Sequence, residues 1–258
     1  MAAKIKELLD FANTIAWQAG KITLRYFQSG VAVDHKADES PVTVADRESE
    51  AYLRAQIMVR YPDHAVLGEE DGLSGGVDAE YRWILDPIDG TKSFVRGVPL
   101  YGVMVGLLRD GEPLVGVVNM PALGEVVSAG TGQGCWWNGR QCRVSSVNRL
   151  RESLAVATVA TGYEEWGKDA AFGRILSTVG MFRTWADCYG YLLVATGRAE
   201  LALDPAMNIW DAAALAPILH EAGGTYTDWQ GTSTIDGGEG VGTNGLVLDE
   251  VLALIRGA

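Results

Sequence analysis

Cysteine and histidine are scarce in this sequence, which holds only 3 of each among its 258 residues. An odd number of cysteines with no CxxC pair disfavours a disulfide framework and a zinc ribbon. The histidines, at positions 35, 64 and 220, form no HxxxH pair and predict no zinc site. The GxSxG and GxxxxGK[ST] motifs are also missing, so Ser/His/Asp hydrolysis and P-loop chemistry have no support.

Positive charge and long apolar runs are lacking as well. Lysine and arginine total 21 against 33 acidic residues, which gives a net charge of -12. Such a chain repels nucleic acid and anionic lipid, so we expect neither as a partner. No apolar run approaches the roughly 18 residues of a membrane span, and residues 1–11 lack the apolar segment of a signal peptide. We therefore expect a cytoplasmic protein without a membrane partner.

Hydrophobic periodicity predicts a mixed N-terminal half over residues 1–150. Helical spacing of apolar residues predicts amphipathic helices over 5–26 and 44–61, with Thr43 as the N-cap of the second. Residues 35–41 predict a loop or short hairpin, and 130–139 a turn. Strands are expected at 65–67, 83–85, 101–108, 114–119 and 125–129, of which 101–108 and 114–119 form an antiparallel hairpin.

The C-terminal half, residues 151–258, has a different pattern. Short apolar segments at 155–158, 201–203 and 225–227 read as strands. They alternate with helical patterns at 169–178, 189–196, 211–222 and 247–255. Alternation of this kind predicts an α/β half. The boundary between the halves contains no flexible linker.

The segment Trp83–Thr91 carries the most informative chemistry. An apolar strand ends at Asp86, and Pro87 and Gly90 then force a tight turn that returns Asp89 to the same side. Two carboxylates held this close repel each other and need a cation or a proton. Mg²⁺ prefers such oxygen ligands. An ordinary turn would contain the same residue types, so this segment alone leaves both interpretations open.

Three further acidic residues also allow two interpretations each. Glu69 follows a strand, where paired glutamates also occur in solvated loops. Asp211 either stabilises a helix N-terminus or, between apolar neighbours, is a partly buried carboxylate that requires a cation. Asp46 is either the N3 residue of a capping box begun by Thr43 or the partner of a catalytic hydroxyl.

Together the motifs resemble the inositol monophosphatase family of Mg²⁺-dependent, lithium-sensitive phosphatases. They are GEE at 68–70, WILDPIDGTKSF at 83–94 and WDAAALAPILHEAGG at 210–224, with VTVAD at 42–46 and TNG at 243–245. The resemblance covers most of the chain. It implies a layered αβαβα sandwich, with an antiparallel N-terminal sheet and an α/β C-terminal half, and a homodimer.

The resemblance also implies roles for individual residues. The matches to ligands of a first metal are Glu69, Asp86 and the carbonyl of Ile88. The matches to ligands of a second metal are Asp86, Asp89 and Asp211. Gly90 and Thr91 resemble the phosphate-contacting pair, while Thr91 and Asp46 resemble the couple that orients the attacking water. Glu69, Thr91 and Asp46 are thus the implied catalytic residues, with two or three Mg²⁺ per site.

The family resemblance implies a mechanism without a covalent intermediate. A metal ion lowers the pKa of a bound water and supplies hydroxide near neutral pH. The hydroxide attacks phosphorus in line, while the metals neutralise the phosphate oxygens and the leaving alkoxide. The expected activity is hydrolysis of a small phosphate monoester.

The segment from Arg183 to Asp204 bears on the substrate. Judged from LVATG at 193–197, Asp187 falls where inositol phosphatases tend to carry a small residue, and Asp204 where they place an acid near the ring. Two carboxylates suit the ammonium and imidazole of L-histidinol phosphate, and the segment resembles the histidinol-phosphate branch of the family. We expect this substrate of histidine biosynthesis, with Arg183 also in the site and inositol 1-phosphate as the alternative. The alternative interpretation, in which Asp187 caps the following helix and Asp204 lies in a turn, stays open.

Two other functions are weighed against this one. In a non-catalytic metal-binding protein the acidic cluster would be a structural Ca²⁺ site, but the carboxylates lack the DxDxDG spacing of an EF-hand. Thr91 and Asp46 would also have no role there. A nucleotide substrate would favour basic residues at the pocket, for which Lys36, Lys92 and Arg183 are the candidates, but the motifs do not favour it.

Overall fold

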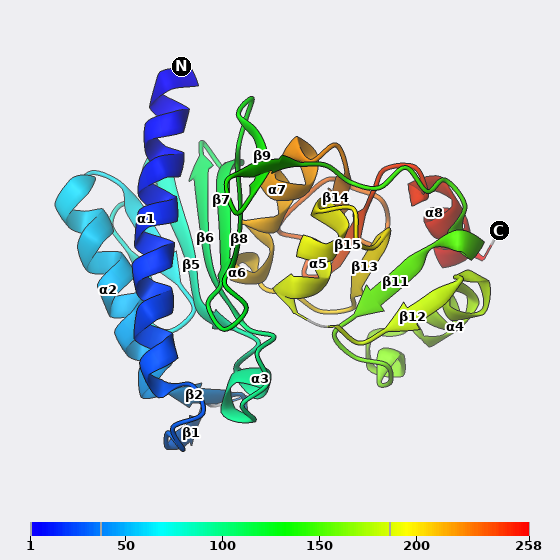
Figure 1. The fold of residues 1–258 in the computed structure, drawn as a ribbon, viewed down its shortest axis with the longest axis horizontal. Coiled ribbons are helices and arrows are strands. Elements are labelled where there is room, and N and C mark those ends of the chain that lie inside the picture. The colour runs from blue at the N-terminus through cyan, green and yellow to red at the C-terminus, as the bar shows by residue number, and fades with distance from the viewer. Residues whose placement is uncertain (1, 37, 186, 258) are drawn as a thin grey trace.

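The computed structural model describes residues 2–36, 38–185 and 187–257, which form a sandwich of alternating helical and sheet layers (Figure 1). One outer layer holds α1 (Ala2–Tyr26) and α2 (Val44–Arg60), and the other holds α4 (Asp169–Thr178) and α8 (Leu248–Arg256). An eight-stranded and a five-stranded sheet lie between them. The central layer consists of α5 (Cys188–Ala195), α6 (Ile209–Ala212) and α7 (Leu215–Glu221). The predicted αβαβα sandwich is confirmed.

The eight-stranded sheet is antiparallel except at one pair, because β3 and β5 run parallel. In spatial order its strands are β10 (Arg140–Cys142), β9 (Gly134–Trp137), β8 (Glu125–Gly130), β7 (Glu112–Met120), β6 (Gly102–Arg109), β5 (Tyr81–Asp89), β3 (Ala65–Gly68) and β4 (Gly72–Ser74). The turn predicted over residues 130–139 is confirmed at residues 131–133 and 138–139, but the prediction missed β9, which lies between them and pairs with both β8 and β10. The expected hairpin near residues 35–41 is formed by β1 (Val33–His35) and β2 (Pro41–Thr43).

The five-stranded sheet is mixed. Its order is β12 (Met181–Arg183), β11 (Leu154–Ala157), β13 (Leu201–Asp204), β15 (Gly240–Thr243) and β14 (Thr225–Thr227). The first three strands run parallel, and the last two are antiparallel to their neighbours. Short 3₁₀ turns at Leu150–Glu152 and Tyr163–Trp166 complete this half.

The single helix expected over residues 211–222 is in fact two, α6 and α7. Pro217 explains the break. In one continuous helix the N–H of residue 217 would donate to the carbonyl of Ala213, and proline has no N–H. In the shorter α7 the proline falls in the first turn, where the N–H would have no helical partner. Across the part of the chain that is described, no helix has the length and apolar character needed to cross a bilayer.

Candidate active site

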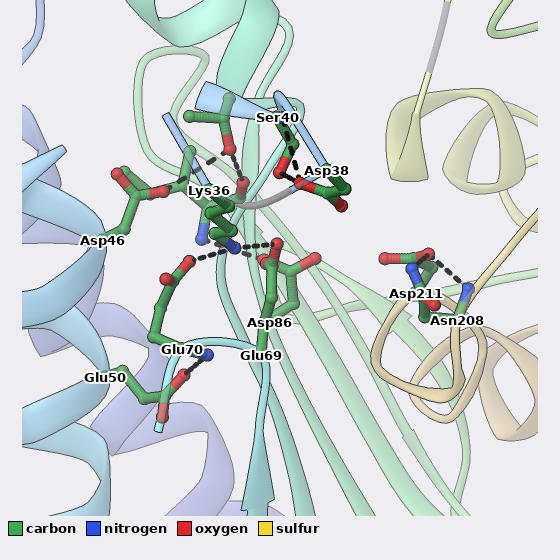
Figure 2. Close-up of polar contacts among 12 residues, drawn as sticks. Lys36, Asp38, Ser40, Asp46, Glu50, Glu69, Glu70, Asp86, Asn208 and Asp211 are labelled. Carbon is green, nitrogen blue, oxygen red and sulfur yellow. Dashed lines mark hydrogen bonds and ion pairs between the residues drawn. The ribbon is translucent and has the colours of Figure 1, made fainter. Parts of the chain in front are cut away.

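Parallel pairing of β3 with β5 brings Glu69 and Asp86 to one edge of the large sheet. Gly68 pairs with Leu85 in the register, so the residues that follow them lie side by side (Figure 2). The Glu69 N–H donates to the Leu85 carbonyl at 3.2 Å. Burial raises the pKa of Asp86 well above its usual range, and repulsion from Glu69 adds to the effect. These two carboxyl groups therefore repel each other at a site largely shielded from water.

An irregularity in β5 turns Asp89 toward Asp86. The pairing with β6 is regular as far as Asp86 and resumes at Asp89 after a shift in register. Gly90 follows with a φ of 84°, in the left-handed region that favours glycine, and α3 (Thr91–Val95) begins directly after it. Burial and the charge of Asp187 raise the pKa of Asp89 well above its usual range. The prediction that the strand ends at Asp86 in a tight turn was wrong in this detail, since β5 continues to Asp89 and the irregularity within it brings the two carboxylates together.

Asp211 joins these residues from the central helical layer. Its Oδ2 accepts the Asn208 N–H at 2.7 Å in a capping box of α6, so it does stabilise a helix N-terminus. Carboxylate oxygens of Asp86, Asp89 and Asp211 also lie within 4.8 Å of one another. Burial raises the pKa of Asp211 as well. The two interpretations open at this residue are therefore compatible.

The donor set fits a hard divalent cation. All three clustered side chains offer oxygen, which Mg²⁺ and similar ions prefer to nitrogen or sulfur. Mutual repulsion in a buried setting disfavours their ionised form, and a cation at their centre would remove that repulsion. The chemistry of the cluster thus agrees with the cofactor expected from the sequence.

Lys36 forms ion pairs with Glu69 and Glu70, next to the acidic cluster. Its Nζ lies 2.6 Å from Glu69 Oε1 and 2.8 Å from Glu70 Oε1 (Figure 2). The sequence had suggested Lys36 only as a candidate contact for a nucleotide. Its position near two glutamates depends on the β1–β2 hairpin packing close to the end of β3, which no local pattern predicts.

Asp46 also serves two purposes. Its Oδ2 accepts the N–H and the hydroxyl of Thr43 at 2.8 and 2.7 Å, which completes the capping box of α2. Its Oδ1 lies 3.4 Å from Thr91 Oγ1, and that hydroxyl also lies 2.9 Å from the carbonyl of Ile88. The capping box is therefore present and Asp46 also lies beside the Thr91 hydroxyl, while a catalytic role for that hydroxyl stays a prediction.

A cavity of about 230 Å³ opens beside these groups. Residues from both halves line it, including Glu69, Asp89, Asp211, Asp187 and Asp204. Gly90, Thr91 and Lys92 line it as well. Asp187 and Asp204, far apart in sequence from the motif at 83–94, thus share one cavity with the acidic cluster.

Thr158 connects the two aspartates that we expect to determine substrate choice. Its N–H donates to Asp204 Oδ1 at 3.2 Å, and its Oγ1 accepts the Asp187 N–H at 3.1 Å. Thr158 falls at the end of a strand predicted from the sequence, where no local pattern suggests a role for it. Parallel β11 and β13 pair Ala157 with Leu203, so Thr158 and Asp204 both follow that pair at the same sheet edge.

Asp187 is held in a strained backbone conformation. Its φ of 54° and ψ of -151° belong to a region populated almost only by glycine. It precedes α5, but its side chain makes no capping hydrogen bond among the described residues, and Asp89 Oδ2 accepts the Cys188 N–H instead at 2.6 Å. Burial raises the pKa of Asp187 to about 6. A strained, partly buried carboxylate that lines the cavity and does not cap its helix points to a functional role.

Arg183 does not reach the cavity. It lies on the exposed edge strand β12, its Nη1 donates to the Phe182 carbonyl at 2.7 Å, and it is not among the described residues that line the cavity. We therefore exclude Arg183 from the candidate site. Ala186, within the segment singled out for substrate choice, lies outside the described residues.

The stability of the metal-free protein is expected to fall as pH rises, in part because of Asp204. Burial raises the pKa of Asp204 from 3.8 to about 7, so between these values the folded state binds a proton that the unfolded state releases. The stabilisation is complete below the lower value and is lost as pH rises through the upper one. In EDTA, thermal unfolding should show a smaller drop in Tm from pH 5 to pH 8 for Asp204→Asn than for the wild type. Asp236→Asn, at an exposed position, is the control, and equal slopes for Asp204→Asn and wild type would contradict this assignment.

Known proteins resemble this chain in sequence and in fold. The model of the inositol monophosphatase family matches residues 4–256. A histidinol-phosphatase of Chlorobaculum parvum is 42% identical over 234 residues, which cover 90% of each chain. One from Mycobacterium tuberculosis is 39% identical over 254 residues, or 96% of this chain and 97% of that one. The solved inositol monophosphatase of Anabaena (Nostoc) superposes with a TM-score of 0.88 at 30% identity, covering 99% of this chain and 97% of that one.

Proposed function

Since the chain belongs to the inositol monophosphatase family, we propose that it is a Mg²⁺-dependent phosphatase that hydrolyses L-histidinol phosphate to L-histidinol. The observation that carries this proposal is one cavity lined by Asp89 and Asp211 of the acidic cluster and by a second acidic pair, Asp187 and Asp204. The first group suits divalent cations, which in turn bind the phosphate group of the substrate. The second suits a leaving group that is itself cationic.

The metal ligands we propose are Glu69, Asp86, Asp89, Asp211 and the carbonyl of Ile88. A divalent cation bound by these oxygens would offset the charge of the phosphate and make an attacking water more acidic. Without it, the acidic surroundings would repel the dianionic ester. The ligands thus reconcile a chain of net charge -12 with an anionic substrate.

Thr91 and Asp46 are proposed to orient the water that attacks phosphorus. Asp46 Oδ1 is placed to accept the Thr91 hydroxyl proton, at a separation of 3.4 Å that a bound substrate would need to shorten. The lone pairs of Thr91 Oγ1 are then free to accept a proton from the water, which fixes its direction. Gly90 and Thr91, both in the cavity wall, are proposed to contact the phosphate.

Asp187 and Asp204 are proposed to bind the ammonium and imidazole of the leaving group. A charge-assisted hydrogen bond of this kind contributes about 1.5–3 kcal/mol, which corresponds to about a 10- to 150-fold preference. An uncharged inositol ring would make neutral hydrogen bonds instead. Inositol 1-phosphate is the alternative substrate, and the similarity to the solved Anabaena (Nostoc) enzyme favours it.

A parallel measurement of kcat/KM for L-histidinol phosphate, inositol 1-phosphate and fructose 1,6-bisphosphate tests the proposal. With Mg²⁺ we expect at least about a tenfold preference for the first, from a single charge-assisted contact. EDTA should remove turnover of all three, and added Mg²⁺ should restore it. A preference for inositol 1-phosphate would overturn the substrate, whereas turnover that persists in EDTA would overturn the metal dependence.

A further inference from the structure

Glu50 is a buried carboxylate without a part in the proposed reaction. It lies on α2, its side chain is 0% exposed, and its Oε1 accepts Arg54 Nε–H at 2.7 Å. Its two oxygens also accept backbone N–H groups, from Glu70 at 2.8 Å and from Asp71 at 3.0 Å. Figure 2 shows Glu50 directly beneath Glu70, on the helix side of the site.

These two amides belong to the turn at residues 69–71, which begins with Glu69 itself. The Glu69 N–H is itself bonded to the Leu85 carbonyl at 3.2 Å. The backbone is therefore anchored to β5 at Glu69 and to α2 one and two residues later. This double attachment fixes the Glu69 backbone, and thereby the point from which its side chain extends toward Lys36, whose Nζ lies 2.6 Å from Glu69 Oε1.

The neighbouring residues are adapted to this attachment. A Cβ atom at Gly68 would lie 2.4 Å from the Glu50 carboxylate, so glycine is what allows the carboxylate to approach the strand. Arg54 in turn donates to the carbonyl of Gly72 and, at 3.0 Å, to Ser74 Oγ. The Glu50–Arg54 pair thus contacts both strands that flank the turn, β3 and β4.

A contribution to folding stability does not by itself explain why the Glu50–Arg54 ion pair is buried here. Two charges taken out of water lose several kcal/mol of hydration each, and apolar residues of similar volume often stabilise a protein as well or better. What apolar residues could not do is accept two amide protons from the turn and hold it in place. Groups that hold metal ligands in position typically account for about a 10- to 100-fold change in metal affinity.

We propose that Glu50, itself held by Arg54, is a positioning residue that fixes the Glu69 carboxylate for cation binding. The inference rests on the proposed function, because it takes Glu69 to be a cation ligand. It assigns to α2 a second contribution to the site besides Asp46.

Mg²⁺ binding to the Glu50→Gln protein, measured by calorimetry without substrate, tests the inference. The amide keeps the size of the side chain but replaces one acceptor oxygen by an NH₂ group that faces N–H donors. We expect the Kd for Mg²⁺ to rise about 10- to 100-fold. The Mg²⁺ concentration for half-maximal turnover should rise in parallel, and kcat at saturating Mg²⁺ should largely recover.

The matched control is Glu221→Gln. Glu221 likewise accepts two loop N–H groups, from Gly132 at 2.8 Å and Gly134 at 2.7 Å, but it does not line the cavity. Its substitution should leave the Kd for Mg²⁺ unchanged. Equal Mg²⁺ affinity in Glu50→Gln and the control would overturn the positioning role. If wild type and control themselves bind no Mg²⁺, the proposed function fails and the inference falls with it.

A second variant covers the case in which Glu50→Gln does not fold, as judged by circular dichroism. Gly68→Ala keeps both charges, and the φ of Gly68 is not positive, so alanine fits the strand backbone. The added methyl group would displace the Glu50 carboxylate from the turn. The same rise in Kd for Mg²⁺ is expected, and an unchanged Kd in this variant would also overturn the inference.

Discussion

Asp86→Asn is expected to abolish phosphate release while the protein stays folded. Asp86 is 2% exposed and takes part in both groups of proposed metal ligands. An amide carries no charge to hold a cation, and the remaining proposed ligands would have to bind it without the carboxylate at their centre. Substitution of a residue that only holds a metal ligand in place typically lowers metal affinity or activity about 10- to 100-fold. Loss of Asp86, which is itself a proposed ligand of both metals, should have a larger effect and reduce kcat/KM by more than about 10³-fold.

The same substitution should not destabilise the metal-free protein. Burial and the charges of Glu69, Asp89 and Asp211 raise the pKa of Asp86, so ionised Asp86 opposes folding at neutral pH. Asparagine removes that repulsion, and the Tm in EDTA at pH 7.5 should equal or exceed that of the wild type. Mg²⁺ should raise the Tm of the wild type and of Asp63→Asn, an exposed control, but not of Asp86→Asn. Retained turnover in Asp86→Asn would contradict the metal assignment.

The part of this site that the sequence predicts is the part built from neighbouring residues. Asp86 and Asp89 are three positions apart, and the proline and glycine between and after them predict that the two carboxylates lie close together, although the structure achieves this by an irregularity in β5 and not by a tight turn. Asp211 could be associated with them only through a family resemblance. Its approach depends on α6 packing against β5 and β6, and helical periodicity carries no information about which sheet a helix will face.

The fold follows a similar division. The 3.6-residue spacing of apolar side chains identifies α1 and α2 because each buries one face on the large sheet. The strand β9 escaped prediction since its glycine-rich surroundings resemble a turn. The long-range hydrogen bonds of Lys36 and Thr158 could not be predicted because they join segments brought together only by tertiary packing.

Asp187→Gly is expected to stabilise the protein and to impair its action on a cationic substrate. Glycine adopts the φ and ψ found at this position without the strain of about 1–3 kcal/mol that other residues meet there. The substitution also removes a carboxyl group whose pKa burial raises to about 6 and which ionises unfavourably at pH 7.5. The extra backbone freedom of glycine in the unfolded chain opposes these gains by about 0.5–1 kcal/mol, so we expect a net rise in Tm.

The cost of Asp187→Gly should appear in substrate choice. Loss of one charge-assisted hydrogen bond should lower kcat/KM for L-histidinol phosphate about 10- to 150-fold, with little change for inositol 1-phosphate. Asp187→Asn separates the two effects, since it removes the charge but keeps a side chain in the strained conformation. It should share the loss of selectivity and show a smaller gain in Tm than the glycine variant. If Asp187→Gly lowers turnover of both substrates equally, Asp187 supports the site as a whole and does not select the leaving group.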